Sequence, residues 1–174
     1  KVFISYAEED SITARKLADD LTLRSADVNA VVFQDEKRRG GIIFEKLSHD
    51  IATANIFLAL LSNNYLQSEW CRVEFEAAFH LERDARTKKS QFEIQILNIG
   101  KVKRDTTLVF ERIYDWIDPD NEKQYQELLN KISKTAREEK EAMPTETTIQ
   151  KGDWVPFINR EEELRYLVRN LENT

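Results

Sequence analysis

Cysteine and histidine are scarce in this 174-residue chain, which has one cysteine and two histidines. A single cysteine, Cys71, excludes an internal disulfide framework and a zinc site built from several cysteines. His49 and His80 lack the paired spacing of metal-binding histidines, so we interpret both as structural residues. Cys71 has no evident histidine partner for nucleophilic catalysis and is predicted to face the core. We therefore expect no metal site and no resident cofactor.

Basic residues are in the minority: 26 lysines and arginines face 32 aspartates and glutamates, a net charge of −6. A general nucleic-acid-binding surface would be basic, so this balance argues against direct nucleic-acid binding. No apolar run approaches the roughly 20 residues that a membrane helix needs. The single cysteine makes the cytoplasm the expected compartment, and the sequence shows no signal-like segment. Apolar residues make up 41% of the chain, which is enough for the core of a globular domain.

Two glycine-rich phosphate-binding motifs are missing. No G-x-G-x-x-G follows the first predicted strand, which argues against a tightly held hydride-carrying dinucleotide. No G-x-x-x-x-G-K-[ST] occurs in the 174 residues, so any ATP site lies outside them. Paired glycines do occur at Gly40 and Gly41, inside the charged loop Glu36–Ile43, where they can adopt positive φ angles.

Apolar patterns over residues 1–141 alternate between strand and helix. Five segments are predicted as strands: Lys1–Tyr6, Val28–Asp35, Asn55–Ser62, Glu93–Ile99 and Arg112–Ile117. Helices are predicted around Ala14–Leu21, Phe44–Ile51, Ser68–Lys88 and from Asp118, with Asn63–Gln67 as a loop and Glu138–Glu141 as a charged tail. Because the third strand is a continuous apolar run, we place it centrally in a parallel sheet. The alternation predicts one α/β domain with a doubly wound sheet.

Residues 142–156 are typical of a linker, because they hold two of the three prolines, the run TETT and a glycine. After the linker, an amphipathic pattern over Phe157–Leu171 begins a further helix. The predicted organisation is therefore a domain at 1–141, a linker at 142–156 and the start of another module at 157–174.

The segment Ser68–Phe79, SEWCRVEFEAAF, is predicted to begin a helix capped by Ser68. Trp70 and Glu74 are four residues apart and so share one helix face. A carboxylate beside a large aromatic ring is one way to hold a flat cationic substrate. The ordinary alternative is a solvated glutamate on a helix with a tryptophan near its start, and helix periodicity alone leaves both open.

Several segments together resemble TIR domains, in the order in which that family has them. They are VFISYAEED at Val2–Asp10, VVFQD at Val31–Asp35, the glycine loop followed by Phe44, IFLALLSNNY at Ile56–Tyr65 and SEWCRVE at Ser68–Glu74. The S-x-W-C-x-x-E element is specific, and the resemblance covers residues 1 to about 141. The bacterial defence type is implied. The segment WVPFINREEELRYL at Trp154–Leu167 resembles the opening of STAND or AAA-type NTPase modules.

The resemblance implies a flavodoxin-like five-stranded parallel sheet in the order 2-1-3-4-5. Ligands of such sheets bind beyond the carboxyl ends of the strands, where the order reverses between the first and third. This placement predicts a cleft with Glu74 as the catalytic residue. The residues expected to bind the substrate there are Ser5, Tyr6, Ala7, Asp35, Ser62 and Trp70.

Enzymatic TIR domains cleave NAD⁺ at the nicotinamide–ribose bond, and Glu74 matches their catalytic glutamate. The resemblance thus implies NAD⁺ as substrate and self-association through a loop between TIR domains. The expected interface residues are Arg38, Arg39, Gly40, Gly41, Ile42 and Ile43. The two arginines could instead meet the pyrophosphate of the substrate. In contrast, the acidic residues Glu8–Asp10 at the first helix should keep the pyrophosphate away from that corner.

Two other functions remain open from the sequence. The domain could be a non-catalytic scaffold that recruits other TIR domains through the same loop, in which case Glu74 would be a surface residue. A phosphoacceptor receiver domain is less consistent, because it expects an aspartate at the end of the third strand, where this chain has Ser62.

Overall fold

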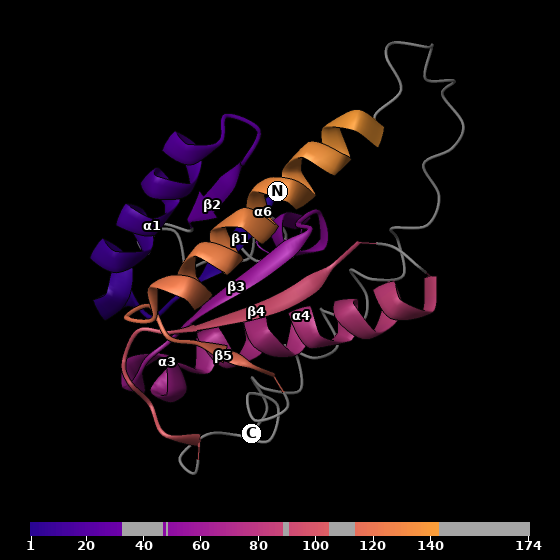
Figure 1. Ribbon diagram of the computed structural model, residues 1–174. Coiled ribbons are helices and arrows are strands. Elements are labelled where there is room, and N and C mark those ends of the chain that lie inside the picture. The colour runs from indigo at the N-terminus through magenta and orange to yellow at the C-terminus, as the bar shows by residue number, and fades with distance from the viewer. Residues whose placement is uncertain (33–46, 48, 89–90, 105–113, 143–174) are drawn as a thin grey trace.

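The computed structural model describes residues 1–32, 47, 49–88, 91–104 and 114–142. Five parallel strands form one sheet in the order β2-β1-β3-β4-β5 (Figure 1), as predicted. The strands are β1 (Val2–Ser5), β2 (Ala30–Val32), β3 (Ile56–Leu61), β4 (Glu93–Asn98) and β5 (Trp116–Ile117). The central strand β3 is buried along its whole length, as its continuous apolar run predicted.

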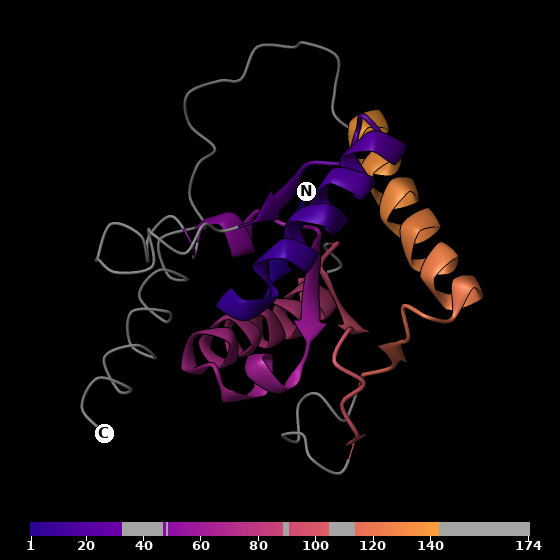
Figure 2. The same cartoon turned by 90° about the vertical axis from the view of Figure 1, so that its left-hand side faces the viewer.

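Helices cover both faces of the sheet (Figures 1 and 2). On one face, α1 (Ser11–Arg24) and α6 (Glu122–Ala142) pack on β1 and β3 through buried residues that include Leu17, Leu21 and Leu128. On the other face, α4 (Glu69–Lys88) packs through Cys71, Phe75, Ala78 and Leu81. The predicted inward orientation of Cys71 is confirmed, since it is 0% exposed. The apolar helix stripes of the sequence are therefore the faces that meet the sheet.

The segment Asn63–Gln67, predicted as a loop, is a short helix, α3. Ser62 caps it, because its Oγ accepts a hydrogen bond from the Tyr65 amide at 3.0 Å. Before α1, the acidic turn contains a one-turn 3₁₀ helix, η1 (Glu8–Asp10). Five residues are too few for a helical period, so the sequence pattern could not reveal α3.

The last described helix, α6, begins at Glu122, and the prediction that Asp118 caps it was wrong. The Asp118 side chain instead accepts from the amide of Asp120 at 2.9 Å and closes a turn. Asn121 accepts from the Gln124 amide at 3.3 Å and takes the capping position. Residues 138–141, predicted as a charged tail, belong to α6.

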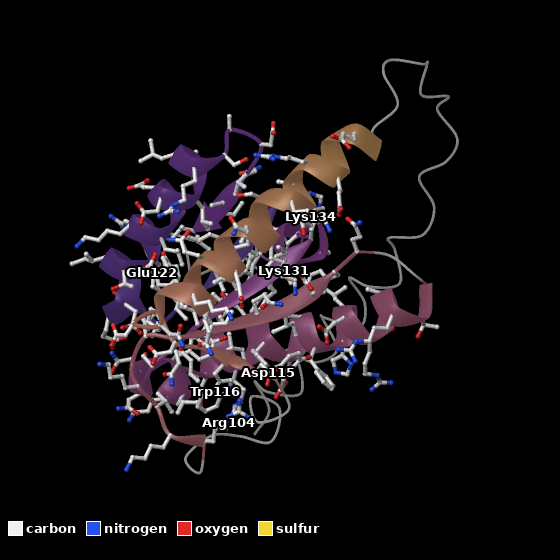
Figure 3. The ribbon with its side chains drawn as sticks, in the orientation of Figure 1. Arg104, Asp115, Trp116, Glu122, Lys131 and Lys134 are labelled. Carbon is white, nitrogen blue, oxygen red and sulfur yellow. The ribbon has the colours of Figure 1, made fainter. Side chains whose placement is uncertain are left out.

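The fifth strand is shorter than predicted, and the residues just before it serve other contacts. Tyr114 is not in the strand; its ring packs edge-on against Phe75 with centroids 5.9 Å apart. Arg104 lies over the ring of Trp116, 5.1 Å from its centroid, and Asp115 is close by (Figure 3). These contacts attach the edge strand to the rest of the domain.

Gly100 follows β4 and lies directly against the end of β3. Its amide donates to the carbonyl of Leu61 at 3.0 Å. A Cβ at this position would lie 2.7 Å from the Cα of Ser62, so only glycine fits without a backbone shift. This close approach fixes the backbone at the residue that caps α3.

Candidate functional site

The candidate site lies at the carboxyl ends of β1 and β3, which are neighbours in the sheet. Ser5 is the last residue of β1 and pairs with Ala59 of β3, and Ser62 follows the end of β3. The strand order reverses between these two strands, which is where ligands bind in doubly wound sheets. The first half of α4 passes beside this edge and brings Glu74 to it.

Glu74 is buried, with a residue exposure of 1%. Its Oε2 accepts a hydrogen bond from the hydroxyl of Ser5 at 2.6 Å, although the two residues are 69 positions apart. The interpretation of Glu74 as a solvated surface residue is therefore wrong. Burying a carboxylate is costly unless hydrogen bonds compensate, so its place in the core requires partners of this kind.

Tyr65 of α3 completes the arrangement around Glu74, and the sequence analysis did not identify it. Its Oη lies 3.1 Å from the Oγ of Ser5, and Tyr65 is only 2% exposed. Sequence alone offered one signal: a tyrosine placed just after the central strand, three residues beyond Ser62. The structure thus brings Tyr65, Ser5 and Glu74 into one buried polar row.

Ser62 is engaged within the protein. Its Oγ donates to the Oδ2 of Asp10 at 2.5 Å and accepts from the Tyr65 amide. Both bonds are local to the carboxyl edge, so this hydroxyl joins η1 to the start of α3. In this conformation the hydroxyl makes structural bonds next to the site, and substrate binding by Ser62 stays a prediction.

The structure separates Tyr6 from the other predicted residues of β1 and its end. Side chains alternate across a strand, so Ser5 and Ala7 share the face of α4, whereas Tyr6 points to the opposite face. Tyr6 is 0% exposed and packs in the cluster of α1 and α6. The Tyr6 side chain therefore lies on the opposite face of the sheet from Glu74, and its predicted contact with the substrate stays a prediction. Ala7 is buried on the expected face.

Trp70 lies one helical turn before Glu74 and is half-buried against the α4 core. It borders a surface cavity of about 460 Å³, a size that suits a small molecule or part of one. Its indole Nε1 is buried and, among the described residues, has no hydrogen-bond partner. The cavity is lined by Glu8, Glu9, Asn64, Gln67, Ser68 and Trp70. The carboxylates, amides and indole that line this cavity suit a flat cation.

The remaining predicted residues lie outside the described part of the chain. These are Asp35 and the expected interface residues Arg38, Arg39, Gly40, Gly41, Ile42 and Ile43. Within the described ranges, no group of three or more His, Cys, Asp or Glu side chains is arranged to hold a metal ion. In the same ranges, none of the helices has both the length and the apolar character to cross a membrane.

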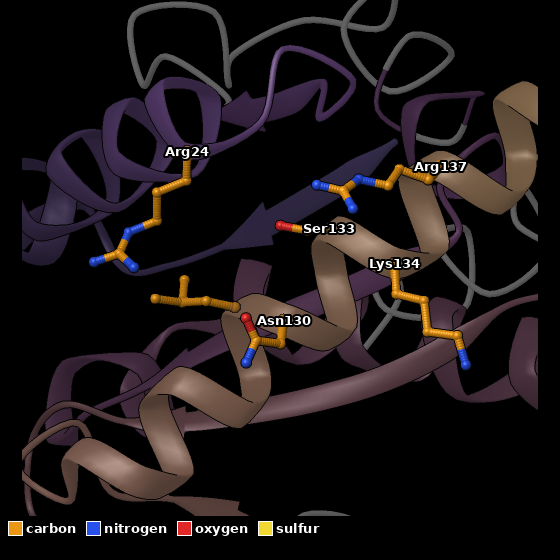
Figure 4. A pocket seen from close by; sticks show the side chains of 6 residues that line it. Arg24, Asn130, Ser133, Lys134 and Arg137 are labelled. Carbon is orange, nitrogen blue, oxygen red and sulfur yellow. The ribbon is translucent and has the colours of Figure 1, made fainter.

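A second cavity, of about 490 Å³, lies between α1 and α6 (Figure 4). Arg137 and Ser133 point to one side of α6 in this view and Lys134 to the other. Arg24 donates to Gln126 at 3.3 Å, and the other cations are exposed. The lining residues are Arg24, Leu129, Asn130, Ser133, Lys134 and Arg137. Because this groove lies on the face away from Glu74 and its cations are solvated, we assign it no part in the site.

The fold and the site define the class: an α/β domain with a buried carboxylate at the switch point of a parallel sheet. The family follows from sequence comparison, in which a model described as TIR domain matches residues 2–132. The chain belongs to the TIR domain family. The comparison with curated proteins finds no match.

One solved structure agrees on the fold. The TIR domain of the Toll-related receptor TRR-2 from Hydra magnipapillata aligns with a TM-score of 0.55 at 14% identity, covering 78% of this chain and 97% of that one. The TIR domains of the activated Roq1 resistosome, which recognises the pathogen effector XopQ, align with a TM-score of 0.43 at 13% identity over 98% of each chain. The second value is too low to support a structural conclusion.

Proposed function

We propose that this TIR domain is an NAD⁺ glycohydrolase that cleaves the nicotinamide–ribose bond with Glu74 as its catalytic residue. The observation that carries the proposal is the placement of Glu74: a carboxylate 1% exposed and bonded by Ser5 at the carboxyl edge of the sheet. A glutamate that only served solubility would lie at the surface. Membership in the TIR family supports this reaction class, because enzymatic TIR domains cleave NAD⁺.

The chemistry explains why one carboxylate is enough. Ordinary glycosidases use a second, protonated carboxyl group to help an alkoxide leave. Nicotinamide leaves as a neutral pyridine and needs no such acid. A carboxylate beside the ribose stabilises the oxocarbenium-like transition state and accepts hydrogen bonds from the ribose hydroxyls. No metal is required at any step of this mechanism.

The cavity beside Trp70 suits the cationic nicotinamide ring of the substrate. The indole of Trp70 and the carboxylates of Glu8 and Glu9 line this cavity, and an aromatic ring with negative charge nearby attracts a cation. The same two carboxylates disfavour the pyrophosphate there, so the rest of the dinucleotide would extend away from η1. Arg38 and Arg39 remain candidates for meeting it, outside the described residues.

Activity would be conditional, because a substrate must touch Glu74 and this carboxylate is buried. Catalysis therefore needs a change of conformation that uncovers it. Self-association through the loop Glu36–Ile43 would supply that change, in defence signalling within the cytoplasm. The segment from Phe157 would then begin an NTPase-like module that senses the trigger. Neither nucleic acid nor a membrane takes a direct part in this scheme.

The test is NAD⁺ consumption and nicotinamide release, measured by chromatography at high protein concentration or on a crowding surface. Wild type, Glu74→Gln and Glu76→Gln are compared, where Glu76 provides a control glutamate on the same helix. We expect turnover by wild type and Glu76→Gln and none by Glu74→Gln. Equal turnover by all three would overturn the role of Glu74, and the product peak would distinguish ADP-ribose from a cyclic product.

The assembly part of the proposal has its own test in the double variant Ile42→Asp/Ile43→Asp. If self-association is needed, this variant should be monomeric and inactive. Full activity in a monomeric variant would remove assembly from the scheme. Self-association of the wild type with no NAD⁺ loss at any concentration, including in the longer chain with its trigger, would favour the scaffold function instead.

A further inference from the structure

We propose that Ser5 and Tyr65 are positioning residues that favour the ionised form of the Glu74 carboxylate and fix its orientation. The positioning part rests on the hydrogen bonds of the structure, and its consequence for catalysis rests on the proposed function. The sequence analysis expected Ser5 to bind substrate; the hydrogen bond of 2.6 Å to Glu74 gives it a different task.

The hydrogen-bonding capacity of the groups sets the direction of this row. The Ser5 hydroxyl donates its single proton to the Oε2 of Glu74, a bond that an ionised carboxylate, which only accepts, makes best. The Ser5 oxygen then accepts, and the phenol of Tyr65 donates to it across 3.1 Å. Each bond polarises the next, which strengthens the donor that reaches the charge. A protonated Glu74 would carry a hydrogen of its own, and the bond from Ser5 would no longer be assisted by a negative charge.

Burial makes these two donors important. Water stabilises an exposed carboxylate, but Glu74, Ser5 and Tyr65 are exposed by only 1%, 1% and 2%. Fixed hydroxyl groups therefore replace part of the solvation that the ionised form has lost. Once a change of conformation has brought the substrate to Glu74, donors that are already in place need no further reorganisation as the cationic transition state forms.

The supports of this row come from separate elements of the fold. Ser5 is held by the strand pairing of β1 with β3, and Tyr65 is held by the cap of α3. That cap, Ser62, is in turn bonded to Asp10. Asp10 and Ser62 thus hold the backbone of Tyr65, and the hydroxyl groups of Tyr65 and Ser5 reach the Glu74 carboxylate. A row anchored on regular elements restricts the rotamer of Glu74.

The first experiment follows the Glu74 carboxyl by NMR with ¹³C-labelled glutamate while the pH is changed. Wild type, Ser5→Ala, Tyr65→Phe and Tyr114→Phe are compared. Tyr114 is a matched control, because its hydroxyl is also bonded to a buried glutamate of α4, Glu82, at 2.8 Å. Loss of a donor to the charged form should move the Glu74 titration midpoint upward by about one pH unit in Ser5→Ala, a roughly tenfold change in the equilibrium.

Tyr65→Phe should move the midpoint in the same direction by less, because its donor reaches Glu74 only through Ser5. Tyr114→Phe should leave it unchanged. Ser5→Thr keeps the hydroxyl and should restore the wild-type midpoint. If Ser5→Ala does not fold, the titrations of Tyr65→Phe and Ser5→Thr still test whether the two hydroxyl groups act on Glu74. A Glu74 midpoint equal in wild type and Tyr65→Phe, or a shift of the same size in Tyr114→Phe, would overturn the proposal.

The second experiment measures NAD⁺ turnover against pH for the same variants. Positioning predicts a lower kcat, a nearly unchanged KM and an acidic limb shifted to higher pH in Ser5→Ala and Tyr65→Phe. A general loss of stability would act equally in Tyr114→Phe. If the wild type shows no turnover, the proposed function fails. The NMR titration of Glu74 still tests whether Ser5 and Tyr65 act on its carboxylate. If turnover is present and its pH profile is the same in all variants, the catalytic part of this inference is wrong.

Discussion

Helix α4 carries two buried glutamates, and they lie at opposite edges of the sheet. Glu74 meets Ser5 at the carboxyl end of β1, whereas Glu82 accepts from the amide of Ile94 at the start of β4. Their exposures are 1% and 7%. A parallel sheet places strand starts at one edge and strand ends at the other, so one helix connects the two edges.

The partners of the two carboxylates differ in kind. Glu82 also accepts from Arg86 at 2.9 Å and from the hydroxyl of Tyr114 at 2.8 Å, so its bonds join α4, β4 and the segment before β5. Glu74 is met by a hydroxyl row at the edge where ligands of such sheets bind. Burial alone therefore does not identify a functional glutamate. The edge of the sheet and the kind of partner distinguish the two.

The largest expected effect comes from exchanging the two carboxylates for amides, one at a time. Glu74→Gln should lower NAD⁺ turnover by roughly 100-fold or more, since the transition-state charge loses its counter-ion. Glu82→Gln should leave the turnover of the folded protein within about twofold. Chromatographic rates on folded fractions check this, and equal losses in both variants would remove the functional distinction between the two sites.

The stability of the two sites should show the reverse order. Glu82→Ala leaves the amide of Ile94 and the hydroxyl of Tyr114 without their acceptor, at a cost of about 2–3 kcal/mol in the free energy of unfolding. Urea titration followed by circular dichroism measures it. The ion pair to Arg86 adds little, because the Arg86 side chain is 73% exposed. A change below about 0.5 kcal/mol would contradict a structural role for Glu82.

Gly100→Ala tests how strongly the carboxyl edge depends on close backbone packing. The added Cβ meets the Cα of Ser62 at 2.7 Å, so one of the two backbone segments must shift. We expect a loss of about 1–3 kcal/mol in the free energy of unfolding and a reduced turnover, because Ser62 caps the helix of Tyr65. Unchanged melting would show that the loop after β4 can relax away from Ser62.

The smallest effect concerns pH at the Glu82 site. Burial first, and the nearby Glu82 carboxylate second, raise the pKa of Tyr114 well above its usual 10.0. The folded state then holds this proton more tightly than the unfolded state. Its contribution to stability is complete below about pH 10 and declines as the pH rises above that value.

Tyr114→Phe should therefore lower stability at neutral pH and flatten its decline above pH 10. Urea titrations of wild type and variant between pH 8 and pH 11 would show this. Burial also raises the pKa of Tyr125, so a shallower alkaline decline should persist in the variant. Parallel curves for the two proteins would mean that Tyr114 ionises freely when folded.

Much of the fold could be predicted from local patterns. The apolar run of β3 and the stripes of α1, α4 and α6 each reflect a period of two or 3.6 residues, which follows from backbone geometry. The element order and the family motifs then limited the sheet to one topology. The S-x-W-C-x-x-E element also identified Glu74 as the residue of interest.

Local sequence signals failed at three places: the capping residue of α6, the short helix α3 and the face on which Tyr6 lies. The segment from Asp118 to Asn121 offers two capping residues, and the turn closed by Asp118 left the cap to Asn121. The α3 helix is too short to show a period. Tyr6 was grouped with Ser5 by proximity in sequence, although the alternation of a strand places them on opposite faces.

The sequence by itself determined the alternation of strands and helices, the parallel sheet and the family, because these depend on periodicity and on residues close together in the chain. Only the tertiary structure decided that Glu74 is buried, that Ser5 donates a hydrogen bond to it and that the hydroxyl of Tyr65 contacts the hydroxyl of Ser5. Residues 5, 65 and 74 meet because β1 and β3 pair in register and α4 crosses their ends. No local pattern encodes that meeting, since it depends on how separate elements pack.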